Sequence, residues 1–260
     1  MRIAVLSDIH GNVFALKAVL EDLRQRQVDL CVNLGDIFYG PIAPKATYDL
    51  LMANQFVTIC GNQDRQIYDA TPEENAGNPT MRFVINDLGA EPIAWLQALP
   101  FDHRLNGDIY MCHGTPTDDA TYLLENVVAG SPKLRSDNEI ITGLNGETAP
   151  VILCGHSHLP RTIRLSSGQV IVNPGSVGLP AYSDERPYPH SMETHSPHAA
   201  YAILGKNDAD RLGWTIDHMK VPYAYEKAVL AAKDRGRDDW ALFLKTGKAG
   251  PVGPQETSVE

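Results

Sequence analysis

Cysteines are few in this sequence of 260 residues, and long apolar runs are missing. The four cysteines, Cys31, Cys60, Cys112 and Cys154, form no Cys-x-x-Cys pair, and each lies in or beside a short apolar run. We therefore expect buried, reduced thiols in a cytoplasmic protein. No segment approaches the roughly 20 apolar residues of a membrane-spanning helix, so we expect no membrane partner. The apolar run near the N-terminus is too short for a signal peptide and predicts a strand instead.

Positive charge is also scarce. Lys and Arg number 22 against 32 for Asp and Glu, which gives a formal net charge of −10. At long range this charge repels the phosphate backbone of nucleic acids, so a polymeric nucleic acid is disfavoured as a partner. A metal site could still make the local field positive. No clear signal marks the oligomeric state, and the sequence is compatible with a homo-oligomer.

Short apolar runs recur along the chain and predict buried strands. They span residues 2–6, 28–34, 56–60, 108–112, 150–154 and 169–172. Between the first two runs, Leu16, Val19, Leu20 and Leu23 are spaced as on one face of a helix, and residues 43–53 predict a second helix. Alternating strands and helices predict right-handed βαβ units with a parallel core sheet.

The second half of the chain has a different pattern. Asn106-Gly107 suits the type I′ turn of a hairpin over 104–109. Segments 164–170 and 199–221 predict further antiparallel strands, and helices are expected over 79–98, 121–127 and 223–245. We expect one α/β domain over residues 1–245 with two packed sheets. A flexible tail should follow over 246–260, because this segment lacks apolar periodicity.

Metal-capable side chains follow five of the apolar runs at the point where each run ends. The stretches are VLSDIHGN (5–12), VNLGDIF (32–38), TICGNQD (58–64), YMCHGTP (110–116) and VILCGHSHLP (151–160). Ligands of open α/β sheets bind beyond the carboxyl ends of the strands. We therefore expect one site at a common edge, built from Asp8, His10, Asp36, Asn62, His113, His156 and His158.

The spacing within these motifs suits metal binding. Asp8 and His10 are two residues apart, so in extended backbone they face the same way and can share one ion, and His156 and His158 repeat this spacing. Taken alone, an Asp-x-His is also typical of a turn cap or a surface pair. Imidazole, carboxylate and amide ligands without thiolate suit Mn, Fe, Zn or Ni. Seven ligands suit two divalent ions with one bridging carboxylate.

The order of these motifs resembles that of a known family. Asp-x-His, Gly-Asp, Gly-Asn-x-Asp, a lone His-Gly and Gly-His-x-His are similar to the calcineurin-like metallophosphoesterase superfamily. SDIHGNVFALKAVLEDL, NLGDIFYGP, HGTP and VNPGSVG resemble its small bacterial phosphodiesterase branch, from residue 1 to about 180. The resemblance implies a metallo-dependent phosphatase-like fold, a four-layer α/β/β/α sandwich of two mixed sheets flanked by helices.

The resemblance also implies roles for the site residues. Asp8, His10 and His158 would hold the first metal, Asn62, His113 and His156 the second, and Asp36 would bridge them. The implied activity is hydrolysis of a small phosphodiester or nucleotide by attack of a metal-bridging hydroxide on phosphorus. Two alternatives stay open: a phosphomonoesterase or nucleotide phosphatase of the same fold, and a non-catalytic metal-binding scaffold such as the similarly folded retromer subunit.

The sequence departs from the family at residue 63. Many members carry a His there that contacts the scissile phosphate and protonates the leaving group, whereas this chain has Gln63. Together with Asp36 and Asn62, we assign Gln63 a catalytic role, because its amide can donate a hydrogen bond to a phosphoryl oxygen. The alternative is that Gln63 faces solvent. GDIFYGP also lacks the Asp-Arg-Gly of Ser/Thr phosphatases and symmetrical diadenosine tetraphosphate hydrolases, which argues against both identities.

Other residues near the motifs are candidates for contacts with substrate. Gly11 and Asn12 begin the first helix, where backbone N–H groups favour phosphate, so we expect them to bind substrate, although Asn12 could equally be an N-cap. Asp64 is expected to cap the turn or the helix that follows. His190, His195 and His198 lie in a Pro-rich connection that would either cover the site or be solvated, and Arg65 is expected at the surface.

Overall fold

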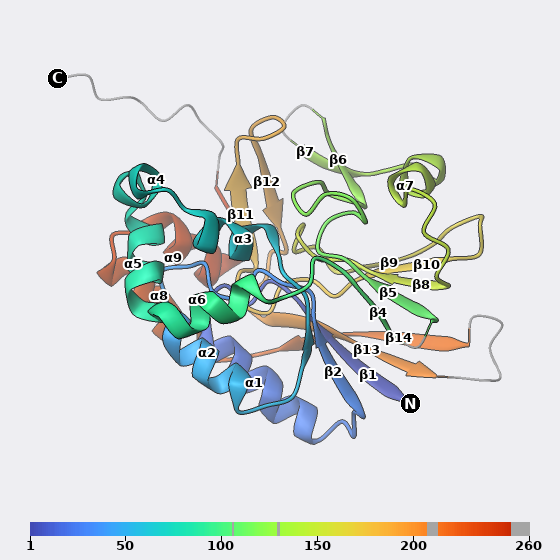
Figure 1. The fold of residues 1–260 in the computed structure, drawn as a ribbon, viewed down its shortest axis with the longest axis horizontal. Coiled ribbons are helices and arrows are strands. Elements are labelled where there is room, and N and C mark those ends of the chain that lie inside the picture. The colour runs from blue at the N-terminus through green and yellow to red at the C-terminus, as the bar shows by residue number, and fades with distance from the viewer. Residues whose placement is uncertain (106, 129–130, 207–212, 251–260) are drawn as a thin grey trace.

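Two five-stranded mixed sheets face each other in the computed structural model, which describes residues 1–105, 107–128, 131–206 and 213–250 (Figure 1). In spatial order the first sheet contains β14 (Trp214–Val221), β13 (Ala199–Lys206), β1 (Arg2–Leu6), β2 (Leu30–Asn33) and β3 (Val57–Thr58). The second contains β4 (His103–Leu105), β5 (Ile109–Met111), β8 (Val151–Leu153), β10 (Val170–Asn173) and β9 (Arg161–Arg164). All six predicted strands are present, and β1, β2 and β3 are parallel as expected.

Helices cover the outer faces of the sheets. The described helices are α1 (Val13–Arg24), α2 (Pro44–Met52), α3 (Asn62–Asp69), α4 (Pro72–Gly77), α5 (Pro79–Leu88), α6 (Ala90–Gln97), α7 (Asp137–Gly143), α8 (Tyr225–Asp234) and α9 (Asp238–Thr246). Figure 1 shows α1, α2, α5, α6 and α8 on the side of the first sheet and α7 beside the second. The predicted four-layer fold is thus confirmed.

Three apolar clusters fill the spaces between these layers. Side chains of β1 alternate between two of these clusters, because successive residues of a strand point to opposite faces. Ile3 and Val5 lie between the two sheets, whereas Ala4 and Leu6 face the helices that cover the first sheet. On the outer face of the second sheet, Ile140 of α7 packs in the third cluster. Because this alternation places the core on both faces of β1, the strand is buried throughout its apolar part and its carboxyl end is held rigidly.

Two of the predicted helices are each divided into two shorter helices, and the third prediction, a helix over 121–127, is wrong. Gly89 (φ 72°) divides segment 79–98 into α5 and α6, and Gly236 (φ 70°) lies where segment 223–245 divides into α8 and α9. Segment 121–127 is not helical, because it enters strand β6 (Glu125–Val128), which pairs with β7 (Ser131–Leu134). The burial of β6 alternates with a period of two, which is the pattern of a strand rather than a helix.

The antiparallel pairings agree with the sequence. β4 pairs with β5, β9 with β10 and β13 with β14, although Asn106 of the first turn lies outside the described residues. A further hairpin, of β11 (Ala181–Asp184) and β12 (His190–Glu193), was not predicted. At the C-terminal end, the Ala249 N–H donates a hydrogen bond to Glu193. Residues 251–260 of the predicted tail lie outside the described residues.

Gly178 holds the segment after β10 against the loop after β1. Its N–H donates to the carbonyl of Asp8, and a Cβ atom at this position would lie 1.7 Å from the carbonyl oxygen of Ile9. No side chain fits at that distance unless one backbone segment moves. The close approach of these two segments therefore depends on glycine.

We expect Gly178→Ala to lower the free energy of unfolding by more than about 3 kcal/mol, in the range reserved for severe packing conflicts. Urea denaturation followed by circular dichroism measures this. Gly77→Ala is the matched control: nothing lies within 4 Å of a Cβ there, and the position is helical. The control should stay within about 1 kcal/mol of the parent. A loss of similar size in both variants would contradict the packing argument.

Candidate metal centre

The carboxyl ends of strands from both sheets deliver the seven predicted ligands to one buried cluster. Asp8 and His10 follow β1, Asp36 follows β2, and Asn62 begins α3 after β3. The second sheet contributes His113 after β5, and His156 and His158 after β8. Two groups of side chains lie with their ligand atoms within 4.8 Å of one another: Asp8, His10 and His158, and Asp36, His113 and His156. The structure thus brings together every residue of the predicted set.

The two groups adjoin each other. His113 Nε2 lies 3.5 Å from Asp36 Oδ2, 3.0 Å from Asn62 Oδ1 and 4.0 Å from Asp8 Oδ1. Asp8 Oδ1 is in turn 3.3 Å from His158 Nε2, whose ring faces that of His10 with the two Nε2 atoms 3.1 Å apart. Carboxylates therefore lie between imidazoles from both sheets, an arrangement that suits a shared carboxylate between two ions.

Backbone carbonyls fix the orientation of all four histidines. The Nδ1–H of His10 donates to Tyr39 O, that of His113 to Leu34 O and that of His158 to Leu179 O. His156 is reversed, because its Nε2–H donates to Ala120 O. Each ring thus turns its other nitrogen toward the cluster, and such outer hydrogen bonds are characteristic of histidines that bind metals. Two lone pairs 3.1 Å apart, as at His10 and His158, repel each other unless a cation or proton lies between them.

The backbone of the ligands corrects one expectation. We predicted that Asp8 and His10, like His156 and His158, face the same way in extended backbone. Instead all four adopt left-handed conformations, with φ angles of 57°, 52°, 66° and 59°, and Asp36 does so too at 55°. The backbone therefore turns sharply at these five residues rather than continuing the strand. The left-handed region costs a non-glycine residue roughly 1–2 kcal/mol. The side chains converge because the chain turns, not because of strand alternation.

The surroundings of the Asp8 carboxylate indicate whether these residues suit a bound cation. Both of its carboxylate oxygens are fully buried, and neither has a hydrogen-bond partner among the described residues. A buried carboxylate that accepts no hydrogen bond is costly, and a bound cation lowers that cost. The donor set of imidazole, carboxylate and amide therefore fits a pair of transition-metal ions.

The pKa values of the cluster follow from its burial and its charges. Burial alone would lower the pKa of His113, but the Asp36 and Asp8 carboxylates outweigh it and raise that pKa to about 10. Burial, together with the neighbouring His158, lowers the pKa of His10 to about 4, and burial with His113 lowers that of His156 to about 4. The carboxylates thus attract positive charge into the cluster, while two of the imidazoles stay neutral and able to bind metal.

The helix α3 presents Gln63 to a cavity of 190 Å³ above the cluster. The Gln63 N–H donates to Asp36 Oδ1 at 2.9 Å, and its side-chain oxygen is buried without a partner among the described residues. Gln63 therefore faces the cavity rather than bulk solvent. Asp64 caps α3 as expected: it accepts hydrogen bonds from the N–H groups of Gly61 and Ile37, and burial beside Asp36 raises its pKa to about 7.

Gly11 and Asn12 were expected to contact substrate, but their N–H groups already donate hydrogen bonds within the protein. The Gly11 N–H donates to Ile37 O and the Asn12 N–H to Ile9 O. The Asn12 side chain accepts from Ala15 N as the N-cap of α1, and its amide donates to Gly178 O and Tyr223 Oη. The N-cap alternative is thus the one that the structure supports, and neither residue lines the cavity.

The histidines of the Pro-rich connection also lie elsewhere. His190 is buried in β12 against the hydroxyl of Tyr122, and His195 lies beside Glu193 with its side chain 62% exposed. Neither these nor His198 line the cavity. Arg65 forms a two-bond ion pair with Asp119 at 2.8 Å. It is therefore engaged at the surface, as expected.

The segment 173–178 supports the cluster from behind. The hydroxyl of Ser176 donates to Asp8 O, while Asn173 donates to Gly155 O ahead of His156. These bonds join the loop after β1 to the loop after β8. The motif NPGSVG thus positions ligands from both sheets rather than contacting substrate itself.

Apart from Tyr39 of NLGDIFYGP, the outer wall of the cavity is formed by residues that the motifs do not include. The wall consists of Tyr39, Leu179, Tyr182, Ser183, Asp184, Arg237, Asp239, Trp240 and Phe243. The ring of Tyr182 packs on His158 with centroids 4.5 Å apart, and its hydroxyl donates to His156 O. Trp240 approaches His10 edge-on at 5.8 Å. Sequence reasoning missed this wall, because no catalytic motif marks β11 or α9.

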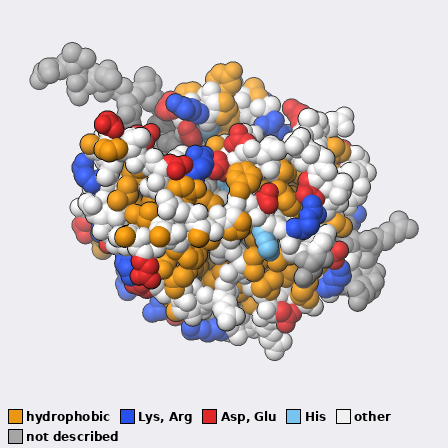
Figure 2. All heavy atoms as spheres, viewed as in Figure 1, with side chains coloured by type: hydrophobic (Ala, Val, Ile, Leu, Met, Phe, Trp, Pro, Cys, Tyr) orange, Lys and Arg blue, Asp and Glu red, His pale blue; other side chains and the backbone are white. Residues whose placement is uncertain are grey.

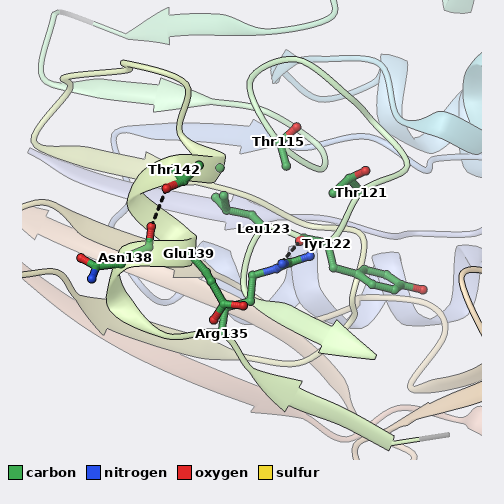
Figure 3. A pocket seen from close by; sticks show the side chains of 9 residues that line it. Thr115, Thr121, Tyr122, Leu123, Arg135, Asn138, Glu139 and Thr142 are labelled. Carbon is green, nitrogen blue, oxygen red and sulfur yellow. Dashed lines mark hydrogen bonds between the residues drawn. The ribbon is translucent and has the colours of Figure 1, made fainter. Parts of the chain in front are cut away.

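A larger hollow of 380 Å³ lies beside α7 (Figure 3). In it, Arg135 donates to Tyr122 O and Thr142 to Asn138 O, and both bonds join lining residues to one another. Its lining includes Glu139 but no histidine or cysteine. The Tyr122 ring stacks on His156 at 4.6 Å and separates this hollow from the cluster. The metal-capable chemistry therefore lies in the smaller cavity.

Fold and site together define a class of protein: a two-sheet α/β sandwich with two adjoining clusters of metal-capable side chains where the strands of both sheets end. The model of the calcineurin-like phosphoesterase superfamily domain matches residues 1–195. The chain belongs to this superfamily, whose members use divalent metals.

Individual proteins resemble the chain over most of its length. The chain is 26% identical to the uncharacterized protein MJ0912 of Methanocaldococcus jannaschii, over 87% of this chain and 91% of that one. The crystal structure of a metallophosphoesterase from Sphaerobacter thermophilus has the same fold, with a TM-score of 0.72 and 24% identity over 95% of this chain and all of that one. The phosphoesterase YfcE of E. coli is more distant, with a TM-score of 0.44 and 21% identity over 85% of this chain and all of that one.

Metal binding should stabilise the folded chain, because the ligands converge only in the native state. At a free Mn²⁺ concentration of about 100 times Kd, we expect about 2.7 kcal/mol of stabilisation over metal-stripped protein. Thermal unfolding with and without Mn²⁺ measures this stabilisation. Elemental analysis of the loaded protein should show two ions per chain.

The Asp36→Asn variant should lose most of this stabilisation. Asp22→Asn is the matched control, because Asp22 lies in α1 and bonds Arg26 and Tyr201 rather than the cluster. The control should keep the full Mn²⁺ effect. An equal effect of Mn²⁺ on the parent and on Asp36→Asn would contradict the assignment.

Proposed function

We propose that the protein is a dinuclear metal-dependent phosphoesterase that hydrolyses a small phosphodiester or nucleotide. The observation that carries this proposal is the convergence of four imidazole rings, two carboxylates and one amide oxygen beside a small cavity. Family membership supports a phosphoric ester hydrolase as the general class. The ligand assignment of the sequence analysis belongs to this proposal: Asp8, His10 and His158 for one ion, Asn62, His113 and His156 for the other, and Asp36 between them.

Bound here, two divalent ions would supply a hydroxide nucleophile at neutral pH and neutralise charge on the phosphoryl oxygens. The chain's own residues hold the geometry. The backbone N–H of Gln63 fixes one oxygen of Asp36 and leaves the other toward His113. The side chain of Gln63, in the cavity wall, is placed to donate a hydrogen bond to a phosphoryl oxygen. In this proposal Asp36, Asn62 and Gln63 are the catalytic residues.

Several further properties belong to the same proposal. A cavity of 190 Å³ suits a small phosphoester. On the face in Figure 2, basic side chains are scattered among acidic ones rather than gathered into a patch, in keeping with a net charge of −10. Polymeric nucleic acid is therefore not proposed as a partner. Among the described residues no helix combines the length and apolarity needed to cross a bilayer. A single domain over residues 1–245 and a cytoplasmic location remain predictions.

The proposal is tested with bis(p-nitrophenyl) phosphate and metal-stripped protein. We expect turnover only after a divalent ion is restored, with Mn²⁺, Fe²⁺, Zn²⁺ and Ni²⁺ compared in parallel. Asp36→Asn should lower kcat by at least about 100-fold, because it removes the carboxylate proposed to lie between the two ions. The control Asp22→Asn should keep parental activity.

Three outcomes are distinguishable. Two bound ions without turnover of any phosphoester would favour the non-catalytic scaffold. Faster turnover of p-nitrophenyl phosphate than of the diester would favour the phosphomonoesterase. Turnover by metal-stripped protein would exclude the metal-dependent mechanism altogether.

Gln63 makes a separate prediction about leaving groups. A glutamine cannot deliver a proton near neutral pH, whereas general acid catalysis is worth about 10²–10⁴-fold. The parent should therefore cleave aryl phosphodiesters, whose leaving groups need little protonation, far better than alkyl ones. Gln63→His should raise kcat/KM for an alkyl diester by about 10-fold or more and leave the aryl diester nearly unchanged. Equal efficiency of the parent on both esters would show that another residue supplies the proton.

A further inference from the structure

Two charged residues, Arg237 and Asp239, line the cavity from outside the segment that matches the family. Arg237 lies at the N-terminal boundary of α9, beyond residue 195. Among the described residues that line the cavity, it is the one with a permanent positive charge. Its side chain is 28% exposed, so its guanidinium is partly desolvated, which strengthens its attraction for an anion.

Neighbouring groups hold this guanidinium in one orientation. Nε and Nη2 donate to the two carboxylate oxygens of Asp239 at 2.9 and 2.7 Å, and Nη1 donates to the hydroxyl of Thr80. The guanidinium also lies over the ring of Trp240, 5.4 Å from its centroid. An arginine fixed on three sides loses little entropy when it binds a ligand, so it is preorganised.

Hydrogen bonds among the described residues use three of the five N–H donors of Arg237. Asp239 takes the edge formed by Nε and Nη2. One N–H on Nη1 and one on Nη2 are left, and such a pair suits two oxygens of a single phosphate. Asp239 therefore anchors the arginine without occupying all of its donors.

The platform under Arg237 is continuous with the metal cluster. Trp240 packs edge-on against the His10 ring, and a Cβ on Gly40 would lie 2.5 Å from His10 O and 2.9 Å from the Trp240 ring. Gly40 thus lets the indole lie close to the ligand loop. The arginine, the indole and a cluster histidine follow one another in direct contact, which gives Arg237 a fixed place relative to the cluster.

Because Gln63 cannot protonate the leaving group, the anion that Arg237 can usefully bind is the leaving group itself. A leaving group that departs without a proton carries negative charge, and a nearby cation stabilises that charge as it develops. Asp184 also lines the cavity, but it is exposed, and one of its oxygens accepts from Arg186 N. Its charge is screened by solvent. The Asp239 carboxylate also lines the cavity and is paired with Arg237, so the anion is bound by the remaining N–H donors of the guanidinium rather than by an unpaired charge.

We propose that Arg237 binds the leaving phosphate of a phosphoanhydride, so that the site prefers nucleoside diphosphates and related anhydrides among small phosphoesters. This inference rests on the proposed function. In the step, the oxygen of water bonds to the attacked phosphorus as the P–O bond to the bridging oxygen breaks. The electron pair of that bond leaves with the departing phosphate beside Arg237. One proton of water stays on the phosphate products, and the other passes to solvent.

The experiment compares ADP with bis(p-nitrophenyl) phosphate in Mn²⁺-loaded protein. Arg237→Gln should lower kcat/KM for ADP by about 10- to 100-fold and change that for the aryl diester by less than about 3-fold. Binding of the non-hydrolysable α,β-methylene ADP, measured by calorimetry, should weaken by about 10-fold or more, and independently of turnover. Arg235→Gln is the matched control, since Arg235 is two residues away, packs over Phe83 and does not line the cavity.

The outcomes separate this inference from the proposed function. Turnover of neither substrate by the parent would remove the proposed function itself. Turnover of the aryl diester with no turnover of ADP, or an equal loss on both substrates in Arg237→Gln, would overturn the role of Arg237 alone. Should Arg237→Gln not fold, Arg237→Lys carries the test. It keeps the charge but loses the planar fork, and it should show a smaller loss that is again confined to ADP and its analogue.

Discussion

The hydrogen bonds from imidazole nitrogens to backbone carbonyls are the constraint on which the site depends. Tyr39, Leu34, Ala120 and Leu179 each supply one carbonyl, and each lies in a loop or strand end that packing of the two sheets fixes in place. A histidine without such a partner could carry its proton on either nitrogen and turn its ring. Here the tautomer and the ring orientation are set before any ligand arrives, because the backbone that sets them is part of the core.

The same loops store backbone strain, and cross-links between them make that strain tolerable. Five of the ligands occupy the left-handed region. The Asp8 N–H donates to Gly35 O and the His10 N–H to Asp36 O, so the loops after β1 and β2 hold each other. Residues held in sparsely populated conformations persist only where the surroundings over-determine them. Burial at the junction of two sheets provides that condition, because moving one loop would break hydrogen bonds of another.

The sequence predicted the parts of the structure that recur in pattern. Apolar runs rich in β-branched residues located the six strands, and the polar side chains after five of them located all seven cluster residues. It could not predict the turns at Asp8 and His10, because no local rule places a non-glycine residue in the left-handed region. It failed at 121–127 because a short apolar run does not distinguish strand from helix. Helices α4 and α7 did leave a signal, since Thr71 with Glu74 and Ser136 with Glu139 form capping boxes.

The division between what was predicted and what was missed follows the physics of the site. Ligands to an ion must be of a few chemical types and lie at strand ends, so the cluster leaves a mark in the sequence. The wall from β11 and α9 needs only shape and charge, which many residues can supply. Trp240 and Arg237 reach the cavity because α9 packs with β11 over residues such as Leu179 and Ala181, a contact set by tertiary packing. The residues proposed to bind the metal ions are therefore separate in sequence from α9, and under the proposed function Arg237 can change without the loss of a ligand, whereas Trp240 packs on His10 itself.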